Sequence, residues 1–501
     1  MRVFCQAAIG LMWVLWVNSA GAQGEKPGLD PDGPWTLADL VRVLESQQAE
    51  LAEQRGMIEA QDLKIVRLVN ELDAIRGDQI ASAGRAEPGE GAAAAIESAT
   101  GPSSIPGSVE ETAKKDEQKQ ETIEKVEQAQ RDDPTRDELR DFVGSLRLPG
   151  TRAALRIGGF VKATMVDSFD PLEVNDRFIV GAIPVSDEDS PVEAQAALTA
   201  NQSRLNFDLR EPTDFGILRA FIEGDFDGGD GGGQFRLRHA FGQWKRVLAG
   251  KTWSAFVDTG ATPEEIDFEG LNGRVNVRQA QVRLFPTIGE HYEFELSAED
   301  PSPLVTNGEG VTRFPDIIAT GRLNWGDRLH FKVGGLYRQV RANWDGAPRS
   351  TEKQTGYGLQ VSGRFDAGWL DARDRILFQI NGGRGIGRYI NDLRSVGDFD
   401  GVFDENGNLE LIDVLAGYVS GQHWWGQTMR SNLTFGFVQL DNPGFVGDDF
   451  YKRTWRISGN LMWSPTPRIT LGGELLWGQR ENQDGSEGNA SQIQFAARYG
   501  F

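Results

Sequence analysis

Apolar and polar residues alternate strictly along residues 491–501, the last segment of the chain. Ile493, Phe495, Ala497, Tyr499 and Phe501 share one face of this segment, and mostly polar residues occupy the other. A period of two predicts a β-strand, because successive side chains of a strand point to opposite faces. Half-buried strands of soluble sheets show the same alternation, so this segment alone leaves the fold open.

The alternation begins at Leu155 and returns in about sixteen segments before the chain ends. Strands of about ten residues with one apolar and one polar face are typical of a transmembrane barrel, whose alternate residues face lipid and lumen. Short connections, such as residues 244–248, alternate with longer ones, such as residues 257–272. Bacterial porin barrels have short turns at the periplasmic end and longer loops outside. We therefore predict an all-β transmembrane barrel of about 16 antiparallel strands over residues 145–501, closed by the strand that ends at Phe501.

A different period precedes the barrel. Apolar residues return every seven positions along residues 37–75, with a second seam that contains three central glutamines. The first seam is Leu37, Leu44, Leu51, Ile58, Ile65 and Leu72, and the second is Leu40, Gln47, Gln54, Gln61, Leu68 and Ile75. This pattern predicts an α-helical coiled coil over residues 36–80, with a single amphipathic helix as the alternative. Residues 81–144 are rich in small and charged residues and are predicted to form a linker.

Residues 1–22 have the features of a signal peptide, with Arg2 before a short apolar core and Ala20 and Ala22 at the cleavage site. The single cysteine, Cys5, would be removed with it, so the mature chain would lack disulfides and thiolate sites. No later run of about twenty apolar residues occurs, which excludes helical membrane spans. The net charge of −22 argues against a nucleic-acid partner.

Several short motifs resemble those of the DcaP-like trimeric porins. They are residues 144–151 (GSLRLPGT), 155–162 (LRIGGFVK), 203–207 (SRLNF) and 249–253 (AGKTW), together with the terminal Phe501. The order of signal peptide, heptad helix, linker and barrel is also similar. The resemblance implies a homotrimer in the outer membrane, a coiled coil in the periplasm, and passive uptake of small anions such as dicarboxylates.

The phase of each predicted strand indicates which charged residues face the lumen. The basic ones are Arg204, Arg210, Arg236, Arg238, Arg328, His330, Lys332, Arg338, Lys452, Arg456 and Arg498. The acidic ones are fewer and are Asp208, Glu223, Asp225, Glu293, Glu295, Asp316 and Glu474. A positively charged lumen predicts an anion-selective pore, although the whole chain is acidic. The alternative is that the arginines only pair with loop carboxylates and anchor the loops.

The residues that we expect to line the pore and contact a solute are Arg204, Arg236, Arg238, Lys251, Arg274, Arg278, Arg328, Lys332 and Arg338. Arg236, Arg238, Arg274 and Arg278 belong to the strands nearest the loop at residues 257–272. This is the third long loop, which usually narrows the lumen in trimeric porins. It carries five carboxylates, namely Asp258, Glu264, Glu265, Asp267 and Glu269. An acidic constriction loop facing a basic wall would create a transverse field that orients a dicarboxylate.

The sequence near the acidic loop suggests two further features, a β-bulge and a calcium site. The apolar phase changes between Val277 and Ala280, which predicts a β-bulge near Arg278 and Gln279. A calcium site in the acidic loop is an alternative to a constriction, although its spacing fits no EF-hand pattern.

No enzyme activity, metal or cofactor is expected. The four histidines, His239, His291, His330 and His423, are scattered and match no metal-binding or hydrolase motif. His239 falls on the predicted lipid-facing phase. Two other functions stay open. One is a structural barrel whose N-terminal coil binds peptidoglycan or another envelope partner, and the other is a sugar-selective channel, which would need aromatic residues along the lumen.

Overall fold

The computed structural model describes residues 139, 142–185, 193–229, 232–326, 328–346, 350–368 and 371–501. The chain divides into two compact units, Met1–Gly107 and Ser108–Phe501, and every described residue belongs to the second. The predicted signal peptide, coiled coil and most of the predicted linker lie outside the described residues and stay predictions. None of the described helices is both long and apolar enough to cross a membrane.

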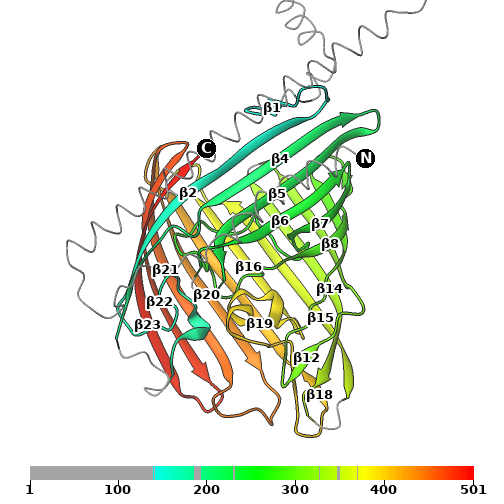
Figure 1. Cartoon of the computed structure of the whole chain (residues 1–501). Coiled ribbons are helices and arrows are strands. Elements are labelled where there is room, and N and C mark those ends of the chain that lie inside the picture. Colours follow the sequence, from blue (N-terminus) through cyan, green and yellow to red (C-terminus); the bar gives the residue numbers. More distant parts are fainter. Residues whose placement is uncertain are drawn as a thin grey trace, which may run out of the picture. The chain divides into compact units, whose positions relative to one another are not determined.

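Sixteen antiparallel strands form the wall of the barrel, and each pairs with the next one along the chain (Figure 1). They are β2 (Ala154–Ser168), β4 (Arg204–Thr213), β5 (Gly216–Gly228), β6 (Gln234–Trp244), β7 (Val247–Trp253), β8 (Arg278–Leu284), β10 (Tyr292–Glu299), β13 (Asp316–Trp325), β14 (Leu329–Trp344), β15 (Thr351–Asp366), β16 (Arg375–Arg384), β19 (Asp413–Trp424), β20 (Met429–Asp441), β21 (Tyr451–Thr466), β22 (Ile469–Asn482) and β23 (Glu487–Gly500). The last strand returns to the first, with Arg498 opposite Lys162, so the sheet closes on itself. The predicted barrel of about 16 strands is confirmed.

Short strands and helical turns are attached to this wall or lie in its connections. Four short strands extend the sheet, namely β1 (Leu146–Arg147), β3 (Ala196–Thr199), β9 (Thr287–Ile288) and β12 (Gly308–Gly310). A separate sheet joins β11 (Val305–Thr306), β17 (Gly401–Phe403) and β18 (Leu409–Leu411). The described helical turns are η1 (Val180–Ala182), η2 (Gly387–Tyr389) and α5 (Asn391–Val396), and all three lie in connections between wall strands.

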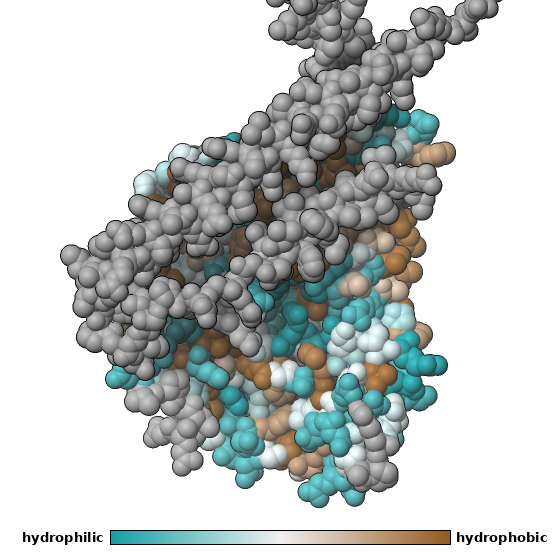
Figure 2. All heavy atoms as spheres, viewed as in Figure 1, coloured by the Kyte–Doolittle hydropathy of each residue, from teal (hydrophilic) through white to brown (hydrophobic). Residues whose placement is uncertain are grey.

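The alternation of the sequence maps onto the two faces of the wall. On β14, Phe331, Val333 and Tyr337 are exposed, whereas Lys332 and Arg338 between them are buried. Figure 2 shows apolar side chains on the outer surface of the described wall, as a lipid-facing surface requires. The apolar side chains therefore point outward and the polar ones inward, which reverses the arrangement of a soluble protein.

Two long connections fill part of the barrel interior. Residues 254–277 follow β7, and residues 385–412 follow β16; the two segments are joined by a β-bridge between Val275 and Ile390. Their apolar side chains form one buried cluster with wall residues, and its members include Phe256, Val277 and Leu393. This packing fixes the 254–277 loop in one position inside the lumen.

The connections at the other end are short turns, as predicted. Three connections at the end of the barrel that carries the long loops are nevertheless short, because their flanking strands continue further. These connections span residues 229–233, 345–350 and 483–486. Long connections remain after β2, β7 and β16, and all three contribute residues to the interior of the barrel.

The strand phase differs from the prediction at two positions. The pairing of β7 with β8 is continuous from Val247 opposite Leu284 to Trp253 opposite Arg278, so the predicted bulge at Arg278 and Gln279 is wrong. The phase changes there because residues 274–277 belong to the inserted loop and not to the wall.

A bulge does occur on β6. Glu223 pairs with His239 and Gly224 pairs with Leu237, so Arg238 is one residue in excess and the phase shifts after it. His239 is consequently buried, with its Nδ1 atom 2.9 Å from Thr252 Oγ1. Its predicted lipid-facing position is wrong.

Candidate functional site

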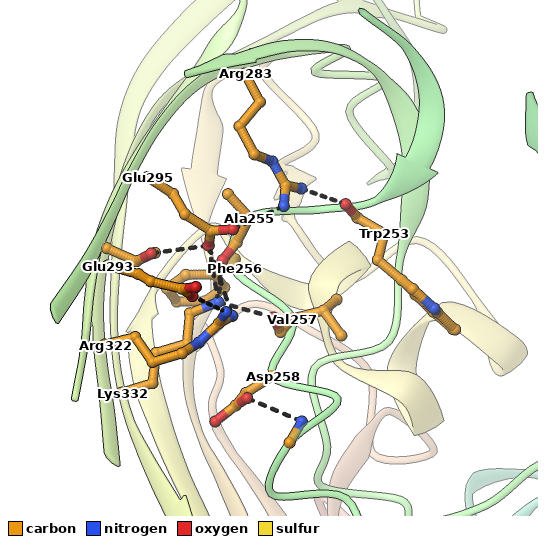
Figure 3. A network of polar contacts seen from close by, with 12 residues as sticks. Trp253, Ala255, Phe256, Val257, Asp258, Arg283, Glu293, Glu295, Arg322 and Lys332 are labelled. Atoms are coloured by element: carbon orange, nitrogen blue, oxygen red, sulfur yellow. Dashed lines mark hydrogen bonds and ion pairs between the residues drawn. The ribbon is translucent and has the colours of Figure 1, made fainter. Parts of the chain in front are cut away.

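The 254–277 loop leaves the wall after Trp253 and is held from its first residues. Lys332 on β14 donates hydrogen bonds to the carbonyl oxygens of Ala255 (2.7 Å) and Val257 (2.9 Å), and it pairs with Glu295 at 3.2 Å (Figure 3). Its side chain is almost fully buried. A buried ammonium group is tolerated only when its donors are satisfied, so Lys332 fixes the path of the loop.

Asp258 anchors the next turn of the loop. Its carboxylate accepts hydrogen bonds from His330 Nε2 (2.8 Å) and Ser362 Oγ (2.6 Å). Burial alone would raise the pKa of Asp258, but these hydrogen bonds and the nearby charge of Lys332 lower it to about 2. Asp258 therefore carries its charge at neutral pH and directs it at the wall of the barrel.

The middle of the loop contacts the far strands of the barrel. Glu264 pairs with Arg430 on β20, and its Oε1 atom lies 2.6 Å from Arg430 Nη2. Glu265 and Asp267 both pair with Arg456 on β21, at 3.0 and 3.1 Å. The backbone N–H groups of Ile266 and Asp267 donate to Glu474 on β22. The loop thus crosses the lumen from β7 to β20, β21 and β22.

Glu269 differs from the other loop carboxylates because the partner of its side chain is a hydroxyl group. Its side chain accepts a hydrogen bond from the hydroxyl group of Ser395 on α5, and burial raises its pKa above the ordinary value. The backbone oxygen of Glu269 accepts hydrogen bonds from Arg274 and Asn391, each at 2.9 Å. This end of the loop therefore rests on the 385–412 connection.

Between the loop and the opposite wall lies a cavity of about 600 Å³. Ten basic residues line it: Lys162, Arg177, Arg204, Arg236, Arg238, Arg274, Arg278, Arg394, Arg430 and Arg498. Four acidic residues also line it, all from the loop: Glu264, Glu265, Asp267 and Glu269. The loop and the wall therefore bring together five of the predicted pore-lining basic residues and four of the five predicted loop carboxylates.

The basic residues of this cavity fall into two groups. Five of them form ion pairs, so much of their charge is already compensated. Arg236 and Arg238 share the buried carboxylate of Asp225, at 2.9 and 2.5 Å. The other three are Arg177 with Asp176 and Asp227, Arg204 with Glu223, and Arg430 with Glu264. In the second group, no carboxylate of the described residues lies within ion-pairing distance. Its members are Lys162, Arg274, Arg278, Arg394 and Arg498.

Two members of the second group are held by aromatic rings. The Arg278 guanidinium lies 4.5 Å from the ring centroid of Trp253, and that of Arg498 lies 4.1 Å from Phe160. The Nη1 atom of Arg278 is buried and finds no hydrogen-bond partner among the described residues. Ring stacking fixes a guanidinium through its face and leaves its N–H edge available for another acceptor.

The match to known proteins agrees with this architecture. The model of the DcaP outer membrane protein family matches residues 157–501. The chain belongs to this family. The structure of the outer membrane channel DcaP of Acinetobacter baumannii shares the fold, with a TM-score of 0.63 and 22% identity over 72% of this chain and 100% of that one.

More distant structures are also similar to the chain. The anion-selective porin from Comamonas acidovorans has a TM-score of 0.47 at 11% identity, over 70% of this chain and 100% of that one. OmpT of Vibrio cholerae has a TM-score of 0.46 at 13% identity, over 71% of this chain and 99% of that one. No curated protein matches the chain.

Four of the basic residues predicted to line the pore of this DcaP-family barrel do not line the cavity. Lys332 holds the loop through Ala255 and Val257. Arg338 is fully buried and pairs with Asp316 (3.3 Å) and Asp400 (3.0 Å), which anchors the 385–412 connection. Arg328 is exposed in the turn before β14, and Lys251 is half-buried on β7 outside the lining. Asp258 is likewise an anchor and lies outside the lining.

Other lining residues were not among the predicted site residues. Arg498 and Lys162 lie opposite each other where β23 meets β2, and the alternation of those strands already places Arg498 inside. Arg177 and Arg394 come from connections, and Arg430 pairs with the loop itself. Strand phase could have identified Arg430, whereas no periodicity marks a loop residue.

Proposed function

We propose that this DcaP-family protein is an outer-membrane porin forming a passive, anion-selective diffusion channel for small negatively charged solutes such as dicarboxylates. The observation that carries the proposal is the uncompensated positive charge of the cavity. Ten basic and four acidic residues line it, and five of the basic residues have no carboxylate partner among the described residues. Rings and clusters of one sign of charge set the selectivity of narrow pores.

The loop carboxylates weaken this field less than their number suggests. Glu265 and Asp267 share Arg456, whose side chain is fully buried, and Glu264 pairs with Arg430. These ion pairs compensate part of the carboxylate charge on the loop side of the cavity. Arg278 and Arg498 remain on the opposite wall, so a solute with two carboxylates would orient toward that wall.

Binding at this wall has to be weak, since a channel that holds its solute tightly does not conduct it. An arginine fork binds a carboxylate through two hydrogen bonds and stays charged at physiological pH. A millimolar site, on the order of −4 kcal/mol, is the expected scale for a diffusion channel. The 600 Å³ cavity suits a small organic anion better than an oligosaccharide.

We further propose that three barrels assemble as a homotrimer, as the likeness to trimeric porins implies. The wall offers many outward apolar side chains, among them Leu433, Leu461 and Leu475, which can contact lipid or a neighbouring barrel. Light scattering on detergent-purified protein should give the mass of three chains. A monomeric mass would contradict this proposal and leave the single-barrel channel intact.

Uptake into proteoliposomes tests the solute class. At equal low concentrations, labelled succinate should enter faster than erythritol, a neutral solute of four carbons, and much faster than the cation putrescine. Protein-free liposomes give the background. Equal rates for the three solutes would show that the pore discriminates by size alone, and faster uptake of putrescine would refute anion selectivity.

A further inference from the structure

A second cluster of arginines lies at the short-turn end of the lumen, away from the cavity. Arg156 on β2, Arg210 on β4 and Arg219 on β5 surround one carboxylate, that of Asp208. The distances to Asp208 are 2.9 Å for Arg219, 3.0 Å for Arg210 and 3.5 Å for Arg156. The short-turn end of bacterial porins faces the periplasm, so this cluster lies at the periplasmic mouth.

One carboxylate does not balance three guanidinium groups. Both oxygens of Asp208 accept hydrogen bonds from Arg210 and Arg219, and the side chain of Asp208 is fully buried beneath them. Arg210 and Arg219 are directly opposite each other on neighbouring strands, a position in which like charges repel. Arg156 makes only the long contact of 3.5 Å, so among the described residues this cluster has more positive than negative charge.

The cluster is open to solvent and its geometry is fixed. The side chain of Arg156 is 42% exposed, and those of Arg210 and Arg219 are each 28% exposed. Aromatic rings cover their faces: Phe142 lies 4.1 Å from Arg210 and 5.0 Å from Arg156, and Phe221 lies 5.1 Å from Arg219. Such stacking orients the guanidinium groups, and their N–H groups that do not bind Asp208 stay available to an acceptor.

This cluster is separate from the cavity. Arg204, which lines the cavity, and Arg210 lie on the same face of β4, six residues apart. At about 3.4 Å per residue, their Cα atoms are about 20 Å apart along the strand. A small anion cannot touch both places at once.

We propose that Arg156, Arg210 and Arg219 form a second binding site for small oxyanions, such as a carboxylate or sulfate, at the periplasmic mouth. This second site rests on the proposed anion channel. With it, two weak sites lie in series along the path of the solute. Multiple weak sites let a solute enter readily and still leave. Asp208 positions the arginines, and Arg156, with the weakest internal contact, is the residue that the solute engages most fully.

Sulfate block of single channels tests the proposal, with sulfate added to one side of the membrane at a time. Replacing Arg156 by Gln should weaken block from one side by about threefold and leave block from the other side near wild type. The Arg156→Lys variant keeps the positive charge and should restore most of the sulfate block. Arg152→Gln is the matched control, because Arg152 is also partly exposed near this mouth but pairs with the exposed Asp214.

Three results would overturn the proposal. The first is an Arg156→Gln channel that behaves like Arg152→Gln. The second is a loss of block that is equal from both sides and is not rescued by lysine, which would indicate a general change of the pore. The third is a wild-type channel that is anion-selective but shows no sulfate block from either side. A cation-selective wild type would instead refute the proposed channel function itself.

Discussion

Replacing Arg278 and Arg498 together by Gln should reduce the preference of the channel for chloride over potassium by about tenfold. Neither guanidinium has a carboxylate within ion-pairing distance among the described residues, so the charge of each acts on a nearby anion in the pore. At about 6 Å in water, one unit charge changes the energy of a chloride ion by ~0.7 kcal/mol. Two charges contribute ~1.4 kcal/mol, which corresponds to about a factor of ten in the local concentration of chloride.

The assay is the reversal potential of the variant in a potassium chloride gradient. The change should be largest near 0.1 M salt, where the Debye length is about 10 Å, and should shrink toward 1 M, where it is about 3 Å. The control variant R278K/R498K keeps both charges and should stay close to wild type. An R278Q/R498Q barrel of normal stability and normal selectivity would refute the assignment of these two arginines as the source of selectivity.

Two further predictions concern the 254–277 loop. Lowering the pH from about 7.5 to about 5 should strengthen anion selectivity, because the raised pKa of Glu269 lets it lose its negative charge before an ordinary glutamate with a pKa of about 4.3 does. The E269Q variant should show the stronger selectivity already at neutral pH and respond less to acid; a wild-type channel that becomes less anion-selective in acid would contradict this. Replacing Lys332 by Met should lower the free energy of unfolding by about 1–3 kcal/mol, because two buried loop carbonyls lose their donor. Urea unfolding in detergent measures this, with R328Q as the exposed control, and an unchanged midpoint for K332M would show that the loop is held by its apolar contacts alone.

Much of the barrel could be predicted because apolar and polar residues alternate along most of the wall, with the apolar side chains facing outward. On β14 the alternation is uninterrupted, and His330, Lys332 and Arg338 lie inside, as their positions in the sequence indicate. The rule gives the face of a residue but not its partner. Lys332 and Arg338 therefore face inward as predicted, yet they anchor loops and do not line the cavity.

The alternation of apolar and polar residues changes phase at two places, and the cause differs between them. Between Val277 and Ala280 the change marks the point at which an inserted loop joins the wall, whereas near Arg238 and His239 it marks a true bulge. Local sequence does not distinguish these cases, because the difference lies in whether the segment pairs with its neighbouring strand. The contributions of Arg177 and Arg394 depend on how two connections pack inside the lumen, and no local period records that packing.

The most direct test of anion selectivity is the reversal potential of the unmodified full-length protein across a bilayer with about a tenfold gradient of potassium chloride at low salt. Because uncompensated arginines line the cavity, we predict a potential of the sign set by chloride, and a smaller magnitude as the mean salt concentration rises. A potential of the sign set by potassium would contradict this prediction, since the loop carboxylates and not the wall arginines would then control the pore.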